Sequence, residues 1–220
     1  MREKKFLLAV PEARVLEWIA RRLPGWVKPD HLTALGVVAS IAIATAYVLS
    51  NGDKLWLWAA SVLLVVHWLG DSLDGTLARV RKSERPRYGY YLDHLVDAFA
   101  TAAIGIGLGL SPHMLLAVGL TIVVAYLILS INTYLETHAF GVFTLGYGRF
   151  GPTEARLMLI AVNTLLVLGI VGNGLLDVLG IGLAIAMIAA LIGRAGRNLR
   201  RLAELEPASS AESRSFNYAH

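Results

Sequence analysis

Long apolar stretches without charged residues alternate along this chain with short charged clusters. Hydrophobic residues make up 56% of its 220 residues, and the mean hydropathy is +0.59. Such a composition is too apolar for an ordinary water-soluble domain. The alternation matches the spans and loops of a membrane protein, so the sequence predicts an all-α, polytopic membrane fold.

Six apolar stretches come close to the length of about 20 residues that a helix needs to cross a bilayer. They cover approximately residues 32–50, 55–80, 89–110, 114–137, 153–172 and 175–197. Turn-forming residues separate several of them, at positions 51–53, 111–112 and 172–174. We therefore expect six transmembrane helices, forming one catalytic domain over residues 29–201.

The segments on either side of this domain differ from it in character. Residues 12–27 place Val15, Trp18, Ile19 and Leu23 on one helical face, with most charges elsewhere. This amphipathic pattern predicts a helix lying on the membrane interface, within a juxtamembrane segment of residues 1–28. Residues 202–220 are rich in Ser, Ala and Glu and are predicted to be disordered.

The basic residues give the predicted orientation. With six spans, all Lys and Arg residues except Lys54 fall on, or at the edge of, the side that holds both termini. An excess of basic residues marks the cytoplasmic side of a membrane. We therefore expect a cell-membrane protein with both termini and the second and fourth interhelical loops in the cytoplasm.

Four aspartates gather at the predicted cytoplasmic ends of the second and third spans. Asp71 and Asp74 are three positions apart, and Asp93 and Asp97 are four apart. Either spacing puts both members of a pair on one face of a helix. Because consecutive spans are antiparallel neighbours, the two pairs are expected to face each other.

Four carboxylates at a membrane boundary need compensation, since each costs on the order of 3 kcal/mol inside a bilayer. The chain has no cysteine and no histidine pair at metal-binding spacing. Oxygen ligands suit hard cations, so the aspartates predict a site for Mg²⁺ or Mn²⁺. Protonation of the carboxylates is the alternative form of compensation.

Small and basic residues beside the aspartates fit a phosphate-bearing substrate. Gly75 and Ala78 leave space next to Asp74, and Gly89 leaves space one turn before Asp93. Arg79 offers a guanidinium fork for phosphate oxygens. Metals and arginine acting on phosphates are the usual components of phosphoryl transfer.

Together these residues read D-x-x-D-G-x-x-A-R, nine residues, then G-x-x-x-D-x-x-x-D, over positions 71–97. The pattern resembles the motif of the CDP-alcohol phosphotransferase family. The segment KPDHLTALG, with Asp30 and Thr33, resembles a short motif that the family carries before its first span. The departures are Pro86, where phosphatidylinositol-phosphate synthases commonly carry Thr, and His94, which gives the D-H-x-x-D form of choline and ethanolamine phosphotransferases.

The resemblance implies roles for these positions. Asp71, Asp74 and Asp93 would hold two metal ions on the CDP diphosphate, and Asp97 would bind metal and act as general base. Residues lining the nucleotide pocket would be Asp30, Thr33, Gly75, Ala78, Arg79 and Gly89. It also implies a homodimer, a lipid bilayer as surroundings, and direct attack of a hydroxyl acceptor on the donor's β-phosphorus with release of CMP; no nucleic acid partner is expected.

The substrates stay open at this stage. CDP-diacylglycerol with a small polar alcohol is the main expectation, and a soluble CDP-choline-like donor with a lipid alcohol is the alternative. Arg149, Arg156 and Arg194 lie on the predicted catalytic side and either bind an acceptor phosphate or anchor the helices. Two other classes, an intramembrane prenyltransferase and a cation transporter, also use intramembrane acidic residues.

Overall fold

The computed structural model describes residues 9–141, 151–172 and 174–206, and these form seven α-helices without a β-strand. The all-α prediction is therefore confirmed for this part of the chain. The helices are α1 (Ala9–Ala20), α2 (Pro29–Leu49), α3 (Trp56–Val80), α4 (Pro86–Gly109), α5 (Leu116–Phe140), α6 (Pro152–Val167) and α7 (Leu175–Leu205).

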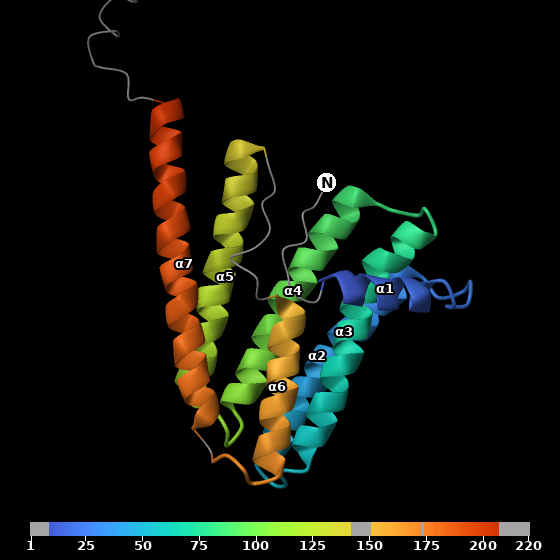
Figure 1. The fold of residues 1–220 in the computed structure, drawn as a ribbon, viewed down its shortest axis with the longest axis vertical. Coiled ribbons are helices and arrows are strands. Elements are labelled where there is room, and N and C mark those ends of the chain that lie inside the picture. The colour runs from blue at the N-terminus through green and yellow to red at the C-terminus, as the bar shows by residue number, and fades with distance from the viewer. Residues whose placement is uncertain (1–8, 142–150, 173, 207–220) are drawn as a thin grey trace, which may run out of the picture.

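Helices α2 to α7 run up and down the molecule, and α1 lies across them beside α3 (Figure 1). Helix α2 packs on α3 and α4, α5 packs on α4 and α7, and α6 packs on α3. The carboxyl end of α3 and the amino end of α4 therefore meet at one end of the bundle, which is shown at the top of Figure 1. The second and third predicted spans, α3 and α4, are antiparallel (Figure 1). They were expected to be packed neighbours, but α2 is the helix that packs on both of them, and α3 and α4 do not pack closely on each other.

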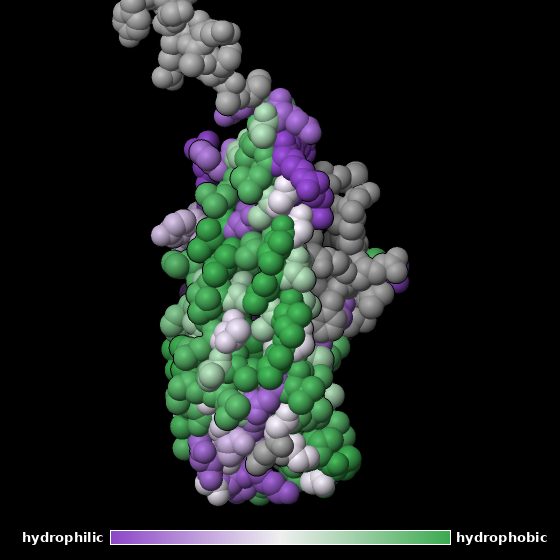
Figure 2. Space-filling model, turned by 90° about the vertical axis from the view of Figure 1, so that its left-hand side faces the viewer, coloured by the Kyte–Doolittle hydropathy of each residue, from purple (hydrophilic) through white to green (hydrophobic). Residues whose placement is uncertain are grey.

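Five helices, α2, α3, α4, α5 and α7, are long and apolar enough to cross a membrane. The face formed on the left of Figure 1 carries a broad hydrophobic band between hydrophilic ends (Figure 2). These features confirm a multi-pass membrane protein. Helix α6 has only 16 residues, fewer than the roughly 20 that span a hydrocarbon core, so its length does not confirm a sixth span.

Two helices end at residues other than the predicted bounds. The fifth span was expected to reach residue 172, but α6 ends at Val167 and Gly169 adopts a left-handed φ of 70°. Glycine adopts this conformation without steric cost and commonly terminates helices. The last helix continues to Leu205, past the predicted domain boundary at residue 201.

Helix α1 is shorter than the predicted amphipathic helix and turns a different face to the bundle. It ends at Ala20, shortly before Pro24, a residue that disfavours helix at the position before it. Leu16 and Ala20 are buried in a cluster with residues of α3, whereas Val15 and Trp18 are 49% and 58% exposed. Some apolar residues of α1 therefore pack on α3, and others are exposed on the surface of the molecule.

Helices α2 and α3 approach each other most closely where glycines face each other. A Cβ atom on Gly70 would lie 2.7 Å from the backbone nitrogen of Gly36 and 2.8 Å from the carbonyl oxygen of Leu32. Real Cβ atoms do not come so near to backbone atoms. Only glycine at position 70 therefore allows this helix separation. Gly70 directly precedes Asp71 and lies one turn before Asp74 on α3, and Gly36 lies one turn after Thr33 on α2.

We expect Gly70→Ala to lower the free energy of unfolding by about 1–3 kcal/mol, the usual cost of overpacking. The added methyl group meets backbone atoms, so α2 must move away from α3. Thermal unfolding in detergent measures the effect. Gly182→Ala on α7 is the matched control, because a Cβ atom there meets nothing within 4 Å. Equal melting temperatures for the two variants would contradict the close packing.

Candidate active site

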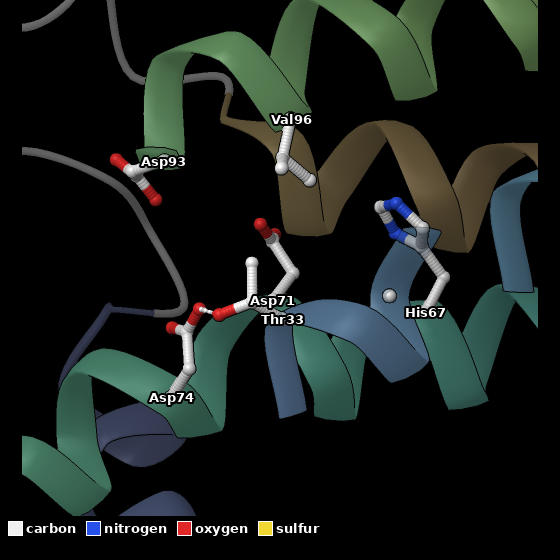
Figure 3. A pocket seen from close by; sticks show the side chains of 7 residues that line it. Thr33, His67, Asp71, Asp74, Asp93 and Val96 are labelled. Atoms are coloured by element: carbon white, nitrogen blue, oxygen red, sulfur yellow. Dashed lines mark hydrogen bonds between the residues drawn. The ribbon is translucent and has the colours of Figure 1, made fainter. Parts of the chain in front are cut away.

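A pocket lies where the ends of α2, α3 and α4 meet (Figure 3). Its lining residues are Thr33 and Gly36 from α2, His67, Asp71 and Asp74 from α3, and Asp93 and Val96 from α4. Asp71 and Asp74 project from α3 towards α4, whose Asp93 stands on the facing side (Figure 3). Three of the four predicted metal ligands therefore line a single pocket.

Asp71 forms an ion pair with an arginine from a third helix. Nη2 of Arg156, on α6, lies 2.6 Å from Oδ2 of Asp71. The Arg156 and Asp71 side chains are only 14% and 20% exposed, so water screens the pair weakly. Arg156 thus offsets part of the negative charge of the pocket and ties α6 to α3.

Asp74 is held by hydrogen bonds rather than by a cation. The hydroxyl of Thr33, on α2, donates to its Oδ2 at 2.6 Å, and the backbone N–H of Gly75 donates to its Oδ1 at 2.5 Å. Thr33 is 8% exposed. The close approach of α2 and α3 brings Thr33 within reach, so the motif before the first span and the aspartate motif meet here.

The two aspartates of α4 differ in their surroundings. Asp93 is 48% exposed, and its Oδ2 lies 3.3 Å from Nδ1 of His94. Asp97 is not among the residues that line the pocket. Three members of the predicted quartet therefore line the pocket, and Asp97, one helical turn after Asp93 on α4, does not.

This geometry can be compared with that of known proteins. Residues 26–193 match the CDP-alcohol phosphatidyltransferase family. The chain belongs to this family. The predicted family resemblance is confirmed, and it extends well beyond the motif of residues 71–97 that suggested it.

A solved structure supports the fold. The chain superimposes on Mycobacterium tuberculosis phosphatidylinositol phosphate synthase with CDP-DAG bound, with a TM-score of 0.68 and 24% sequence identity. The match covers 84% of this chain and 94% of that one. Nearly all of the neighbour's helices thus have a counterpart in this CDP-alcohol phosphatidyltransferase family member.

Curated relatives carry several different names. Phosphatidylinositol phosphate synthase of Cutibacterium acnes is 33% identical over 99 residues, covering 44% of this chain and 45% of that protein. Cholinephosphotransferase 1 of Danio rerio is 25% identical over 160 residues, covering 67% of this chain and 40% of that protein. The chain spans less than half the length of the curated relatives it matches. Their names are those of transferases, so the predicted enzyme class is confirmed at the level of the family.

The CDP-alcohol phosphatidyltransferase family is known to use divalent cations, and the donor set here fits them. Asp71, Asp74 and Asp93 offer only oxygen atoms, as Mg²⁺ and Mn²⁺ prefer. As they stand, no three acidic or histidine side chains among the described residues are close enough to hold one ion. Two of these carboxylates accept hydrogen bonds from Arg156 and Thr33 instead.

Of the predicted nucleotide residues, Thr33 lines the pocket, whereas Gly75, Ala78, Arg79 and Gly89 are not among its lining residues. A Cβ atom on Gly89 would meet nothing within 4 Å, and one on Gly75 would meet only the end of the Arg79 side chain. Arg79 is exposed and donates to the hydroxyl of Thr76 at 2.9 Å, while Ala78 is half-buried. These positions leave the space that the sequence predicted.

Asp30 has a partner that the sequence reading missed. Nη2 of Arg85 donates to both of its carboxylate oxygens, at 2.6 and 2.8 Å, and joins the start of α2 to the segment before α4. The hydrogen bond to Asp30 raises the pKa of the Arg85 guanidinium, which therefore remains charged. Asp30 is neutralised by Arg85 and does not line the pocket.

The three predicted acceptor arginines have different positions. Arg156 is not among the residues that line the pocket, but it forms an ion pair with Asp71, which is. Arg194, on α7, donates to both carboxylate oxygens of Glu136 on α5, at 2.6 and 3.0 Å, and is 8% exposed. Arg149 lies outside the described residues.

Glu12 on α1 joins three helices and was not predicted. Its Oε1 accepts hydrogen bonds from Trp68 Nε1 on α3 at 2.8 Å and from Thr153 Oγ1 on α6 at 3.0 Å. Ser72 Oγ on α3 lies 3.5 Å away. Because Thr153 stands one turn before Arg156, α1 helps to place the helix that neutralises Asp71. The sequence did hold one indication of this role. Glu12 lies four residues before Leu16, on the same face of α1, and Leu16 is buried against α3.

We expect Glu12→Ala to loosen α1, because Trp68 and Thr153 lose a partly buried acceptor at a cost of about 1–3 kcal/mol. Hydrogen exchange of residues 9–20 in detergent measures this loosening. Glu17→Ala on the same helix is the control, since its ion pair with Arg21 is exposed and contributes about 0.5 kcal/mol or less. Equal exchange in the two variants would contradict the role of Glu12.

Proposed function

We propose that this protein transfers a substituted phosphate group from CDP-diacylglycerol to the hydroxyl of an acceptor alcohol and releases CMP. The observation that carries the proposal is the pocket lined by Asp71, Asp74 and Asp93 from two helices. Carboxylates that converge from two helices suit a cation-bound diphosphate. The CDP-DAG bound in the structural neighbour supports this choice of donor.

The proposed cofactor is Mg²⁺ or Mn²⁺, with two ions held by Asp71, Asp74, Asp93 and Asp97. When bound, such ions neutralise charge on the phosphate oxygens and hold the diphosphate in place. Thr33 fixes the orientation of Asp74 through its hydrogen bond, so the carboxylate needs little reorganisation to bind an ion.

The remaining roles fall to side chains of the chain itself. Asp97 takes the proton of the acceptor hydroxyl as its oxygen bonds to the β-phosphorus, and the bond from that phosphorus to CMP breaks. The nucleotide would lie along Gly75, Ala78, Arg79 and Gly89, where the helix surfaces are open. Asp30 and Thr33 would border the same site from α2.

Among the basic residues, Arg156 is the strongest candidate for contact with the acceptor. It pairs with Asp71, a residue that lines the pocket, and a bound cation at Asp71 would share that carboxylate and free part of the guanidinium. Arg194 is a weaker candidate because Glu136 occupies it with two hydrogen bonds. Arg149 remains a proposed contact on the basis of the sequence alone.

A soluble donor such as CDP-choline, with a lipid alcohol as acceptor, is the second candidate. Two cholinephosphotransferases align with 67% and 68% of this chain, a longer stretch than the phosphatidylinositol phosphate synthase alignment covers. His94 beside Asp93 gives the D-H-x-x-D form that resembles those enzymes. Family membership supports neither a prenyltransferase nor a cation transporter.

For the protein as a whole we propose six spans, with α6 as a short sixth helix, in a catalytic domain of residues 29–201. The aspartates and both termini would face the cytoplasm, because the basic residues collect at that end. A homodimer is proposed from the family resemblance. Nucleic acid has no place in this function.

We expect the purified protein in lipid nanodiscs to release CMP from CDP-diacylglycerol when a suitable alcohol is present. Excess chelator should abolish release, and Mg²⁺ or Mn²⁺ should restore it, because the carboxylates need a cation to bind the diphosphate. Several CDP-alcohols and hydroxyl compounds are offered in turn, and mass spectrometry of the lipid product identifies both substrates. Product from CDP-choline alone would favour the second candidate.

Asp97→Asn serves as the chemical control in this assay. It should reduce turnover by about 10²–10⁴-fold, the usual contribution of a general base, with donor binding retained. Asp53→Asn, an exposed carboxylate in the turn between the end of α2 and the start of α3, should be as active as the wild type. Full activity in excess chelator, or wild-type rates for Asp97→Asn, would contradict the proposed mechanism.

We expect Arg156→Ala to raise the acceptor KM by about tenfold or more, as loss of a charged hydrogen bond costs about 1.5–3 kcal/mol. The measurement uses saturating donor and cation. Arg194→Ala tests the weaker candidate in the same way. Arg14→Ala, an exposed charge on α1, is the control for a general loss of positive charge. An unchanged KM in either test variant would remove that arginine from the acceptor site.

A further inference from the structure

His67 is a buried imidazole that lines the inner end of the aspartate pocket (Figure 3). It is 3% exposed and stands one turn before Asp71 on α3. Residues His67, Asp71 and Asp74 follow one another at spacings of four and three, so they share one face of the helix. His67 therefore belongs to the same surface as the predicted metal ligands.

The Nδ1 atom of His67 has no hydrogen-bond partner among the described residues. A buried polar atom without a hydrogen-bond partner lowers the stability of the fold by about 1–3 kcal/mol. An apolar side chain at position 67 would avoid this desolvation cost. The other polar side chains of the pocket are engaged elsewhere: Asp71 accepts from Arg156, and Asp74 accepts from Thr33. The pocket therefore contains an unused hydrogen-bonding group at its inner end.

The missing partner must be small and polar, because the group is enclosed between α2, α3 and α4. A cation at Asp71 would bring such a partner with it. Mg²⁺ and Mn²⁺ in carboxylate sites usually keep several bound waters, and these waters are positioned by hydrogen bonds to groups that do not touch the ion. An imidazole one helical turn deeper than the ligand is suitably placed for this contact.

We infer that His67 holds a water molecule coordinated to a divalent cation at Asp71, and so acts as a positioning residue for that cation. The inference rests on the metal site proposed above and adds a residue to it. The carboxylates supply the charge that attracts the cation. His67 restricts where its water shell, and therefore the ion, can sit.

The test is a titration of the full-length protein in nanodiscs with Mn²⁺ alone, followed by electron paramagnetic resonance. We expect His67→Phe to weaken Mn²⁺ binding by about 10–100-fold, the usual effect of losing such a partner. His67→Asn keeps a polar atom near the place of Nδ1 and should restore binding to within a few-fold. His113→Phe, another buried histidine in the segment between α4 and α5, should bind as the wild type.

Wild-type affinity in His67→Phe would overturn the inference while leaving the proposed function intact. Failure of the wild type to bind Mn²⁺ would overturn both. If His67→Phe does not fold, crystals of the wild type grown with Mn²⁺ decide the question. A water between the ion and the imidazole supports the inference, and direct ligation by the ring, or a ring without contact to the water shell, overturns it.

Discussion

The ion pair between Asp71 and Arg156 connects the charge of the pocket to the packing of the bundle. Four aspartates on two adjacent helices repel one another, and an arginine 85 positions away in the chain offsets part of that repulsion. Helix α6 is fixed at its other end by Asn163, which donates to Tyr47 on α2 and Ser61 on α3. Removing one partner of a partly buried pair leaves an uncompensated charge, so the position of α6 depends on the aspartates it faces.

The local part of this arrangement could be predicted from the sequence. Helical spacing placed Asp71 with Asp74 and Asp93 with Asp97. The expected direct packing of α3 on α4 is absent: α2 packs on both helices, and the pocket lies where the three helices meet. The contacts of Arg156 and Glu12 could not be predicted in the same way. They join helices that are far apart in the chain, and their geometry depends on how α1 and α6 pack on α3. The end of α6 at Val167 could not be predicted either. It depends on the backbone conformation of the residues that follow, which the length of an apolar stretch does not determine.

Arg194 illustrates how neighbouring helices change the meaning of a basic residue. In the sequence it is one of several arginines at the predicted cytoplasmic ends, equally suited to a phosphate or to an anchoring role. In the structure Glu136 neutralises it with two hydrogen bonds, and Asn198 donates to the same carboxylate at 3.1 Å. Its charge therefore holds α7 against α5, whereas the charge of Arg156 is directed into the pocket.

The length of α7 has a consequence for how the molecule sits in lipid. Its 31 residues correspond to about 46 Å of helix, against a hydrocarbon thickness of about 30 Å. The excess lies at the carboxyl end, where Arg197, Arg200 and Arg201 follow the apolar part. These guanidinium groups would lie level with lipid phosphates and fix the depth of immersion. A thicker or thinner bilayer would then be accommodated by tilt of the helices, with the arginines remaining among the headgroups.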